Sequence, residues 1–230
     1  MKWIENAAAR LADAVNGFLG PLAEYLEGYV WDWPEQAPLL AILLLGTGLF
    51  VTVRLAFVQV KGFRHAIDIA RGVYDDPKDA GDLNHFQALT TALSATVGIG
   101  NIAGVAIGIR MGGPGALFWM WLTAFFGMAL KYAECTLALK YRHLHKDGSV
   151  SGGPMFYISK GLGGNWKIMG AVFAGCAAVC SFGSGCMNQS NTLAVRVETH
   201  FGLPAVWSGI IFASLVALVI IGGIKRIGRV

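Results

Sequence analysis

The chain has 230 residues, of which 55% are hydrophobic and only 14% are charged, and its formal net charge is +4. This composition is typical of an integral membrane protein and excludes an ordinary water-soluble domain. Apolar stretches of about 20 residues recur along the chain, the length that a helix needs to cross a bilayer. We therefore predict an all-α integral membrane protein.

Residues 1–35 differ in composition from everything that follows them. They carry six acidic and two basic side chains, with apolar residues such as Ile4, Leu11 and Phe18 spaced to form one stripe on a helix. The charges prevent this segment from spanning a bilayer, so we expect an external amphipathic helix that lies on the membrane surface.

Residues 36–230 are expected to form the membrane domain. We predict five spans in it, at residues 38–56, 86–109, 115–138, 168–187 and 204–224. Between the first two, Phe63, Ala66, Ile67 and Ala70 have helical spacing, which indicates a short helix at the cytoplasmic interface.

The second predicted span contains glycine and asparagine halfway along its length. Gly98, Gly100 and Gly104 each cost about 1 kcal/mol relative to alanine in a helix, and Asn101 places an amide where lipid offers no partner. We expect the helix to break there, because broken backbone in a membrane is tolerated only in protein or in a water-filled cavity. Transporters use such segments to bind ions and solutes. Helix packing through Gly100 and Gly104 is the alternative.

Polar residues in the later spans have two interpretations each. Glu134 lies three residues after Lys131, so an ion pair is preferred over a functional carboxylate. Gln189 and its neighbours Asn188 and Asn191 either cap a helix at the surface or bind a buried ligand. The glycine-rich segment between the third and fourth spans is expected to be a loop or a re-entrant element.

The distribution of basic residues predicts the topology. With the N-terminus outside, 14 of the 18 Lys and Arg residues fall on one side, which would be the cytoplasm, and the exceptions are Lys2, Arg10, Arg110 and Arg196. Topology explains these charges, so nucleic acid is not expected as a partner.

Motifs for catalysis or metal binding are missing from the sequence. It has no GxSxG, HExxH or acidic metal motif, and His143 and His145, two residues apart, would face different sides of a helix. We therefore expect no enzyme, no cofactor and no metal site beyond a coupling ion.

Four stretches carry a resemblance to a known family: ALSATVGIGNIAGVA, GGPGALFWMWLTAFFGMALKYAE, SGGPMFYI and GGIKRIGRV. Together they resemble the alanine/glycine:cation symporters, which are amino-acid carriers of the prokaryotic plasma (inner) membrane. The resemblance implies sodium-coupled uptake of alanine or glycine, with a proton as the other possible ion. It also implies the leucine-transporter-like fold, in which two five-helix repeats build a site from one broken helix each.

Within that fold the resemblance assigns roles to residues of the second span. The substrate would contact Thr96, Gly98, Gly100 and Asn101, together with Gln189 from the fourth span. Sodium would contact the main-chain carbonyls of Ala95, Thr96, Val97 and Gly98, since it is a hard cation that favours oxygen.

The same resemblance implies that this chain holds a leading helix and four helices of the first repeat. On that basis we expect an N-terminal half that lacks its C-terminal half and does not transport alone. The alternative function is a non-transporting membrane scaffold or interaction subunit whose glycines serve only helix packing.

Overall fold

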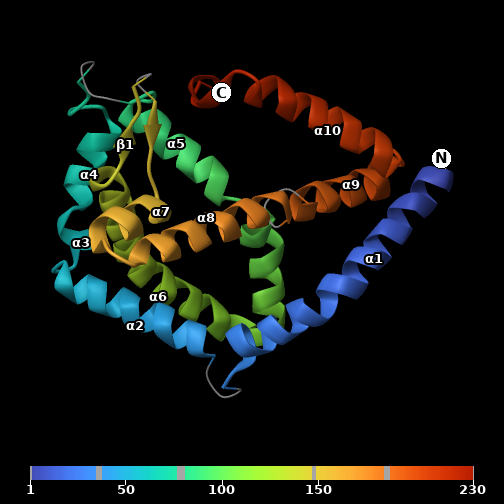
Figure 1. Ribbon diagram of the computed structural model, residues 1–230, viewed down its shortest axis with the longest axis horizontal. Coiled ribbons are helices and arrows are strands. Elements are labelled where there is room, and N and C mark those ends of the chain that lie inside the picture. The colour runs from blue at the N-terminus through green and yellow to red at the C-terminus, as the bar shows by residue number, and fades with distance from the viewer. Residues whose placement is uncertain (1, 35–37, 77–80, 147–148, 184–186, 230) are drawn as a thin grey trace. The chain divides into compact units, whose positions relative to one another are not determined.

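A computed structural model describes residues 2–34, 38–76, 81–146, 149–183 and 187–229 of the protein (Figure 1). It divides into two compact units, Met1–Ala56 and Phe57–Val230. Most of the described residues are helical, as the composition predicts, and their only β structure is one short hairpin.

The first unit consists of two helices joined by an irregular turn. The predicted amphipathic segment forms α1 (Lys2–Glu27) and a π-helical turn, η1 (Gly28–Asp32). The first predicted span forms α2 (Leu39–Arg54). The N–H of Leu39 donates to the carbonyl of Trp33 at 3.0 Å, which joins the start of α2 to the end of the preceding turn.

The second unit begins with two short helices and ends with a short basic one. Its elements in chain order are α3 (Val58–Lys61), α4 (Phe63–Ala70), α5 (His85–Thr96), η2 (Gly100–Gly104), α6 (Val105–Lys140), β1 (His143–Leu144), β2 (Val150–Ser151), α7 (Pro154–Tyr157), η3 (Ile158–Leu162), α8 (Trp166–Gly183), α9 (Met187–Phe201), α10 (Ala205–Ile220) and α11 (Gly223–Ile227). The α7 and η3 helices pack on α8, α7 also contacts α6, and α9 contacts α10. The interfacial helix expected from the spacing of Phe63, Ala66, Ile67 and Ala70 is α4.

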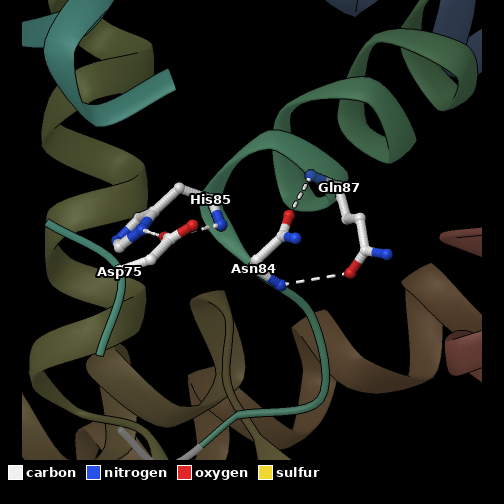
Figure 2. A network of polar contacts seen from close by, with 4 residues as sticks. All are labelled: Asp75, Asn84, His85 and Gln87. Carbon is white, nitrogen blue, oxygen red and sulfur yellow. Dashed lines mark hydrogen bonds and ion pairs between the residues drawn. The ribbon is translucent and has the colours of Figure 1, made fainter. Parts of the chain in front are cut away.

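A network of polar contacts fixes the start of α5 (Figure 2). The N–H of Gln87 donates to Asn84 Oδ1 at 2.8 Å, and the N–H of Asn84 donates to Gln87 Oε1 at 3.2 Å. This reciprocal capping box satisfies two N–H groups that a helix start would otherwise leave without partners. The His85 side chain pairs with Asp75 from the preceding loop.

The pairing with His85 also favours the ionised form of the Asp75 carboxyl. Its hydrogen bond to the His85 side chain holds the pKa of the Asp75 carboxyl below its ordinary value. A second ion pair joins the C-terminal part of the unit to the same loop, because Lys225 Nζ lies 3.3 Å from Asp82 Oδ1. These two pairs tie the loop before α5 both to α5 and to α11.

The second and third predicted spans are not separated by a loop in this structure. A helix runs from Gly100 to Lys140, and Gly113 alone departs from helical geometry, with φ 66° and ψ −167°. Pro114 follows immediately, and proline removes a helical hydrogen bond and clashes with the preceding turn. The Gly-Gly-Pro-Gly sequence therefore changes the direction of the chain within α6 (Figure 1).

The remaining predicted spans coincide with apolar helices of differing length. The stretch Gly100–Lys140 is the one described helix that is both long and apolar enough to cross a membrane, and three shorter apolar helices are Leu39–Arg54, Trp166–Ser181 and Ala205–Ile220. Whether each helix crosses the bilayer stays a prediction. The fourth predicted span, residues 168–187, includes residues 184–186, which lie outside the described residues.

Most large apolar side chains of the described chain are exposed. Ala129 is the one hydrophobic residue that is fully buried among the described residues, whereas Phe50 and Ile168 are 68% and 71% exposed. A water-soluble fold would bury such side chains, because exposing apolar area costs about 25 cal/mol per Å². Lipid or further protein must therefore cover these helices.

Candidate functional site

The helix expected to break does end where the glycines begin. Helix α5 stops at Thr96, and Val97 is extended, with φ −79° and ψ 103°. Helical hydrogen bonding then resumes as the π-helical turn η2, Gly100–Gly104, which leads into α6. The prediction of a broken helix at this point is confirmed.

The break leaves the last main-chain carbonyl oxygens of α5 without hydrogen-bond partners within the helix. The N–H of Val97 donates to the carbonyl of Leu93 at 2.8 Å, and the last carbonyls of a helix have no partner within it. Ala95, Thr96 and Val97 follow Leu93, so three of the four carbonyls that the resemblance assigns to sodium lie in this stretch. The fourth, that of Gly98, accepts the N–H of Asn101 at 3.1 Å.

The hydroxyl of Thr96 has its proton directed back into α5. Thr96 Oγ1 donates to the carbonyl of Ala92 at 2.8 Å. While this bond stands, the hydroxyl has no proton to offer a substrate carboxylate, but its lone pairs can still contact a cation. The hydroxyl therefore suits the coupling ion better than the substrate contact that the resemblance assigns to Thr96.

Gln189 lies against the broken segment. A Cβ atom added to Gly98 would stand 2.9 Å from Gln189 Nε2 and 3.5 Å from Gln189 Cδ. The side-chain amide of Gln189, carried by α9, thus occupies the space that any other residue at position 98 would fill. The structure brings together two of the predicted substrate contacts, Gly98 and Gln189, which are 91 residues apart in sequence.

The other glycines of this segment have no such neighbour. An added Cβ at Gly100 or at Gly104 would meet nothing within 4 Å in the described chain. The helix-packing alternative needs a partner surface at these two positions, and the described residues supply none. The N–H groups at the start of η2 have no partner within the helix, as at any helix start, so Gly100 lies at a place suited to an anion.

Glu134 forms the expected ion pair. Lys131 Nζ lies 3.0 Å from Glu134 Oε2, one turn apart on α6. Nearby on α7, burial raises the pKa of the Tyr157 phenol, and the Glu134 charge adds to this effect. The expected pairing of Glu134 with Lys131 is confirmed, and the absence of a transport role for Glu134 stays a prediction.

The histidine pair departs from the expectation. His143 and His145 lie on and next to β1, not on a helix, and residues two apart on a strand share a face. Their rings are 4.7 Å apart between centroids. The inference that they face different sides was wrong because it assumed a helix. Still, the described residues contain no group of three or more His, Cys, Asp or Glu that could hold a metal ion.

Sequence reasoning missed the hairpin and the links around the loop before α5. The strands β1 and β2 are two residues each, too short to show a period in the sequence. The Asn84–Gln87 capping box has a recognisable spacing, N-x-x-Q before an apolar run, and could have been found. The pairs of Asp75 with His85 and of Asp82 with Lys225 are contacts that no local pattern signals.

Comparison with known proteins identifies relatives over almost the whole chain. The model of the sodium:alanine symporter family matches residues 18–230. The sodium/alanine symporter AgcS of Methanococcus maripaludis is 48% identical over 90% of this chain and 45% of its own length. In Bacillus subtilis, the probable sodium/glutamine symporter GlnT is 40% identical over 90% of this chain and 42% of its own. The amino-acid carrier protein AlsT of the same organism is 38% identical over 93% and 43%. The chain thus spans less than half the length of these relatives.

Proposed function

Because the chain belongs to the sodium:alanine symporter family, we propose that it provides one broken helix and one amide side chain to the binding site of a cation-coupled amino-acid carrier. The family consists of membrane transporters and not of enzymes, in agreement with the lack of catalytic motifs. The proposed substrate is alanine or glycine, and the proposed coupling ion is sodium, with a proton as the alternative. The approach of Gln189 to Gly98 beside the helix break carries this proposal.

The two ends of the break carry partial charges of opposite sign, which suit the carboxylate of a zwitterionic amino acid at one end and the coupling cation at the other. The start of η2 presents N–H groups and the positive end of a helix dipole, which favour the substrate carboxylate at Gly98 and Gly100. The N–H of Asn101 already donates to the Gly98 carbonyl, so Asn101 would contribute its side-chain amide. The end of α5 presents carbonyl oxygens at Ala95, Thr96 and Val97, which favour sodium. Solute and ion would then stabilise each other's binding, because each supplies charge opposite to the other.

Gln189 would add specificity to this site. Its amide can donate to a carboxylate or accept from an ammonium group, and it approaches the break from a different helix. Transport would follow when the helices rearrange around the occupied site, as in other carriers built from broken helices. The leucine-transporter-like arrangement of repeats is part of this proposal.

The proposed location is the plasma membrane of a prokaryote. Family membership implies a membrane protein, and the distribution of Lys and Arg supports an external N-terminus and a cytoplasmic C-terminus. In this topology α1 lies on the outer surface, and the loop that carries Asp75 and Asp82 faces the cytoplasm.

The proposal is tested by sodium-dependent uptake of radiolabelled alanine in cells that produce the protein from its complete reading frame. Asn101→Ala and Gly100→Leu should each abolish most of this uptake, because they alter the groups proposed to bind the carboxylate. Gly46→Leu is the matched control, since Gly46 lies in α2 and an added Cβ there meets nothing within 4 Å. No sodium-dependent uptake by the unaltered protein at normal membrane levels would favour the scaffold function instead. Unchanged uptake in both site variants would refute the proposed binding site.

A further inference from the structure

A strongly basic segment lies between α6 and α8, outside the proposed transport site. From residue 135 to residue 197 the only acidic residue is Asp147, which lies outside the described residues. The part of this stretch before α8 carries four basic side chains, namely Lys140, Arg142, Lys146 and Lys160, and Lys167 follows in the first turn of α8. We call the described residues 140–146 and 149–162 the basic hairpin segment.

Main-chain pairing gives the basic hairpin segment a defined shape. The strands β1 and β2 pair antiparallel, with His143 opposite Ser151 and Leu144 opposite Val150. The N–H of His145 donates to the carbonyl of Ser149 at 2.9 Å and extends this pairing.

Side-chain contacts join the hairpin to the helices that follow it. The His143 ring stacks on Phe156, with centroids 6.5 Å apart and planes inclined by 5°. Lys160 Nζ lies 5.5 Å from the centroid of the same Phe156 ring and donates to the carbonyl of Arg142 at 3.4 Å. The positive charge of Lys160 is therefore held next to the hairpin, where it adds to those of Lys140 and Lys146.

Apolar side chains project from the same segment. Leu144, between the two histidines, is 54% exposed, and Leu162 at the end of η3 is 60% exposed. Lys140, Lys146 and Lys160 are exposed as well. A segment that combines exposed cationic side chains with exposed leucines has the composition that suits the boundary between anionic headgroups and acyl chains.

We propose that the basic hairpin segment binds the anionic phospholipid headgroups of the leaflet on its own side of the membrane. The segment begins at the last residue of α6 and ends four residues before α8, so it lies at headgroup depth if these two apolar helices enter the bilayer. Juxtamembrane clusters of four or more Lys and Arg bind anionic lipid in this way. A divalent metal at the two histidines is disfavoured, because the surrounding lysines repel it.

The test compares the full chain in nanodiscs of phosphatidylcholine alone and of phosphatidylcholine mixed with phosphatidylglycerol. Amide hydrogen exchange over residues 143–151 should be slower in the anionic discs. A triple variant, Lys140→Gln, Lys146→Gln and Lys160→Gln, should weaken the headgroup association about 100-fold, at about fivefold per lysine. The matched triple Lys→Arg variant keeps the charge and should keep the protection.

Three results would overturn the proposal. The first is equal exchange of the hairpin in neutral and anionic discs. The second is a Lys→Gln variant that retains the protection, which would assign the effect to shape and not to charge. The third is protection by zinc in neutral discs together with no effect of phosphatidylglycerol, which would assign the segment to a metal. Unchanged exchange in α6 and α8 shows that the variants remain folded.

Discussion

Replacing Gly98 with alanine should impair transport without unfolding the protein. The added Cβ would stand 2.9 Å from Gln189 Nε2, whereas such atoms are at their best separation at about 3.5–4.0 Å. The Gln189 amide must therefore move by about 0.6–1 Å. The fold tolerates this movement, because the displaced atom is the far end of a flexible side chain.

The same displacement of the Gln189 amide is large enough to break its proposed hydrogen bond to the substrate. Loss of one hydrogen bond to a charged ligand costs about 1.5–3 kcal/mol, which corresponds to a roughly 10- to 100-fold rise in the KM for alanine. The assay is sodium-dependent uptake at varied alanine concentrations, with the amount of protein in the membrane measured alongside. Gly104→Ala is the matched control, because an added Cβ there meets nothing within 4 Å.

A double-mutant cycle between Gly98 and Gln189 tests whether the two residues act through their contact. If Gly98→Ala acts by moving Gln189, then Gln189→Ala alone should be as harmful, and the double variant should be no worse than Gln189→Ala. Additive effects of the two substitutions, or an unchanged KM in Gly98→Ala, would show that the contact has no role in binding.

Three further predictions concern the ends of helices and the ion pairs. Asn84→Ala should lower stability by about 1 kcal/mol through loss of the cap of α5, whereas Asn84→Ser should retain most of it, as measured by thermal unfolding. The pKa of Asp75 is lowered in the folded protein, so its pairing with His85 stabilises the loop near neutral pH and is lost as the pH falls through that lowered pKa. Hydrogen exchange near residue 75 should therefore rise in acid, and Asp75→Asn should abolish this rise. An equal rise in the variant would contradict the prediction. Glu134→Gln should leave sodium-dependent uptake within about twofold of that of the unaltered protein, because a solvent-exposed ion pair contributes only about 0–1 kcal/mol. Loss of uptake at normal protein levels would instead give Glu134 a transport role.

Local patterns in the sequence were enough to predict most of the helices. The apolar runs gave α2, α8 and α10 to within a few residues, and the spacing of Phe63, Ala66, Ile67 and Ala70 gave α4. The break after Thr96 was predictable because Gly98, Gly100 and Asn101 oppose a helix in lipid by known amounts.

Features that depend on contacts between distant residues, or on the conformation of a single residue, could not be predicted from local sequence patterns. The sequence GGPG signals a turn, but only the structure shows that the change of direction is confined to Gly113 within one helix. The side chain of Thr96 could be placed near the site, yet the direction of its hydrogen bond depends on the carbonyl of Ala92 one turn earlier. The closeness of Gln189 to Gly98 follows from how α9 lies beside the break, which no local pattern encodes.

The measurement that tests the central claim most directly is an experimental density map of the protein from its complete reading frame, with and without alanine and sodium. We expect density for the substrate carboxylate against the main-chain N–H groups at Gly98 and Gly100, within hydrogen-bond distance of the Gln189 amide, and sodium at the carbonyls that end α5. A map in which the chain from Ser94 to Val105 is an unbroken helix, or in which the substrate binds elsewhere, would contradict the account.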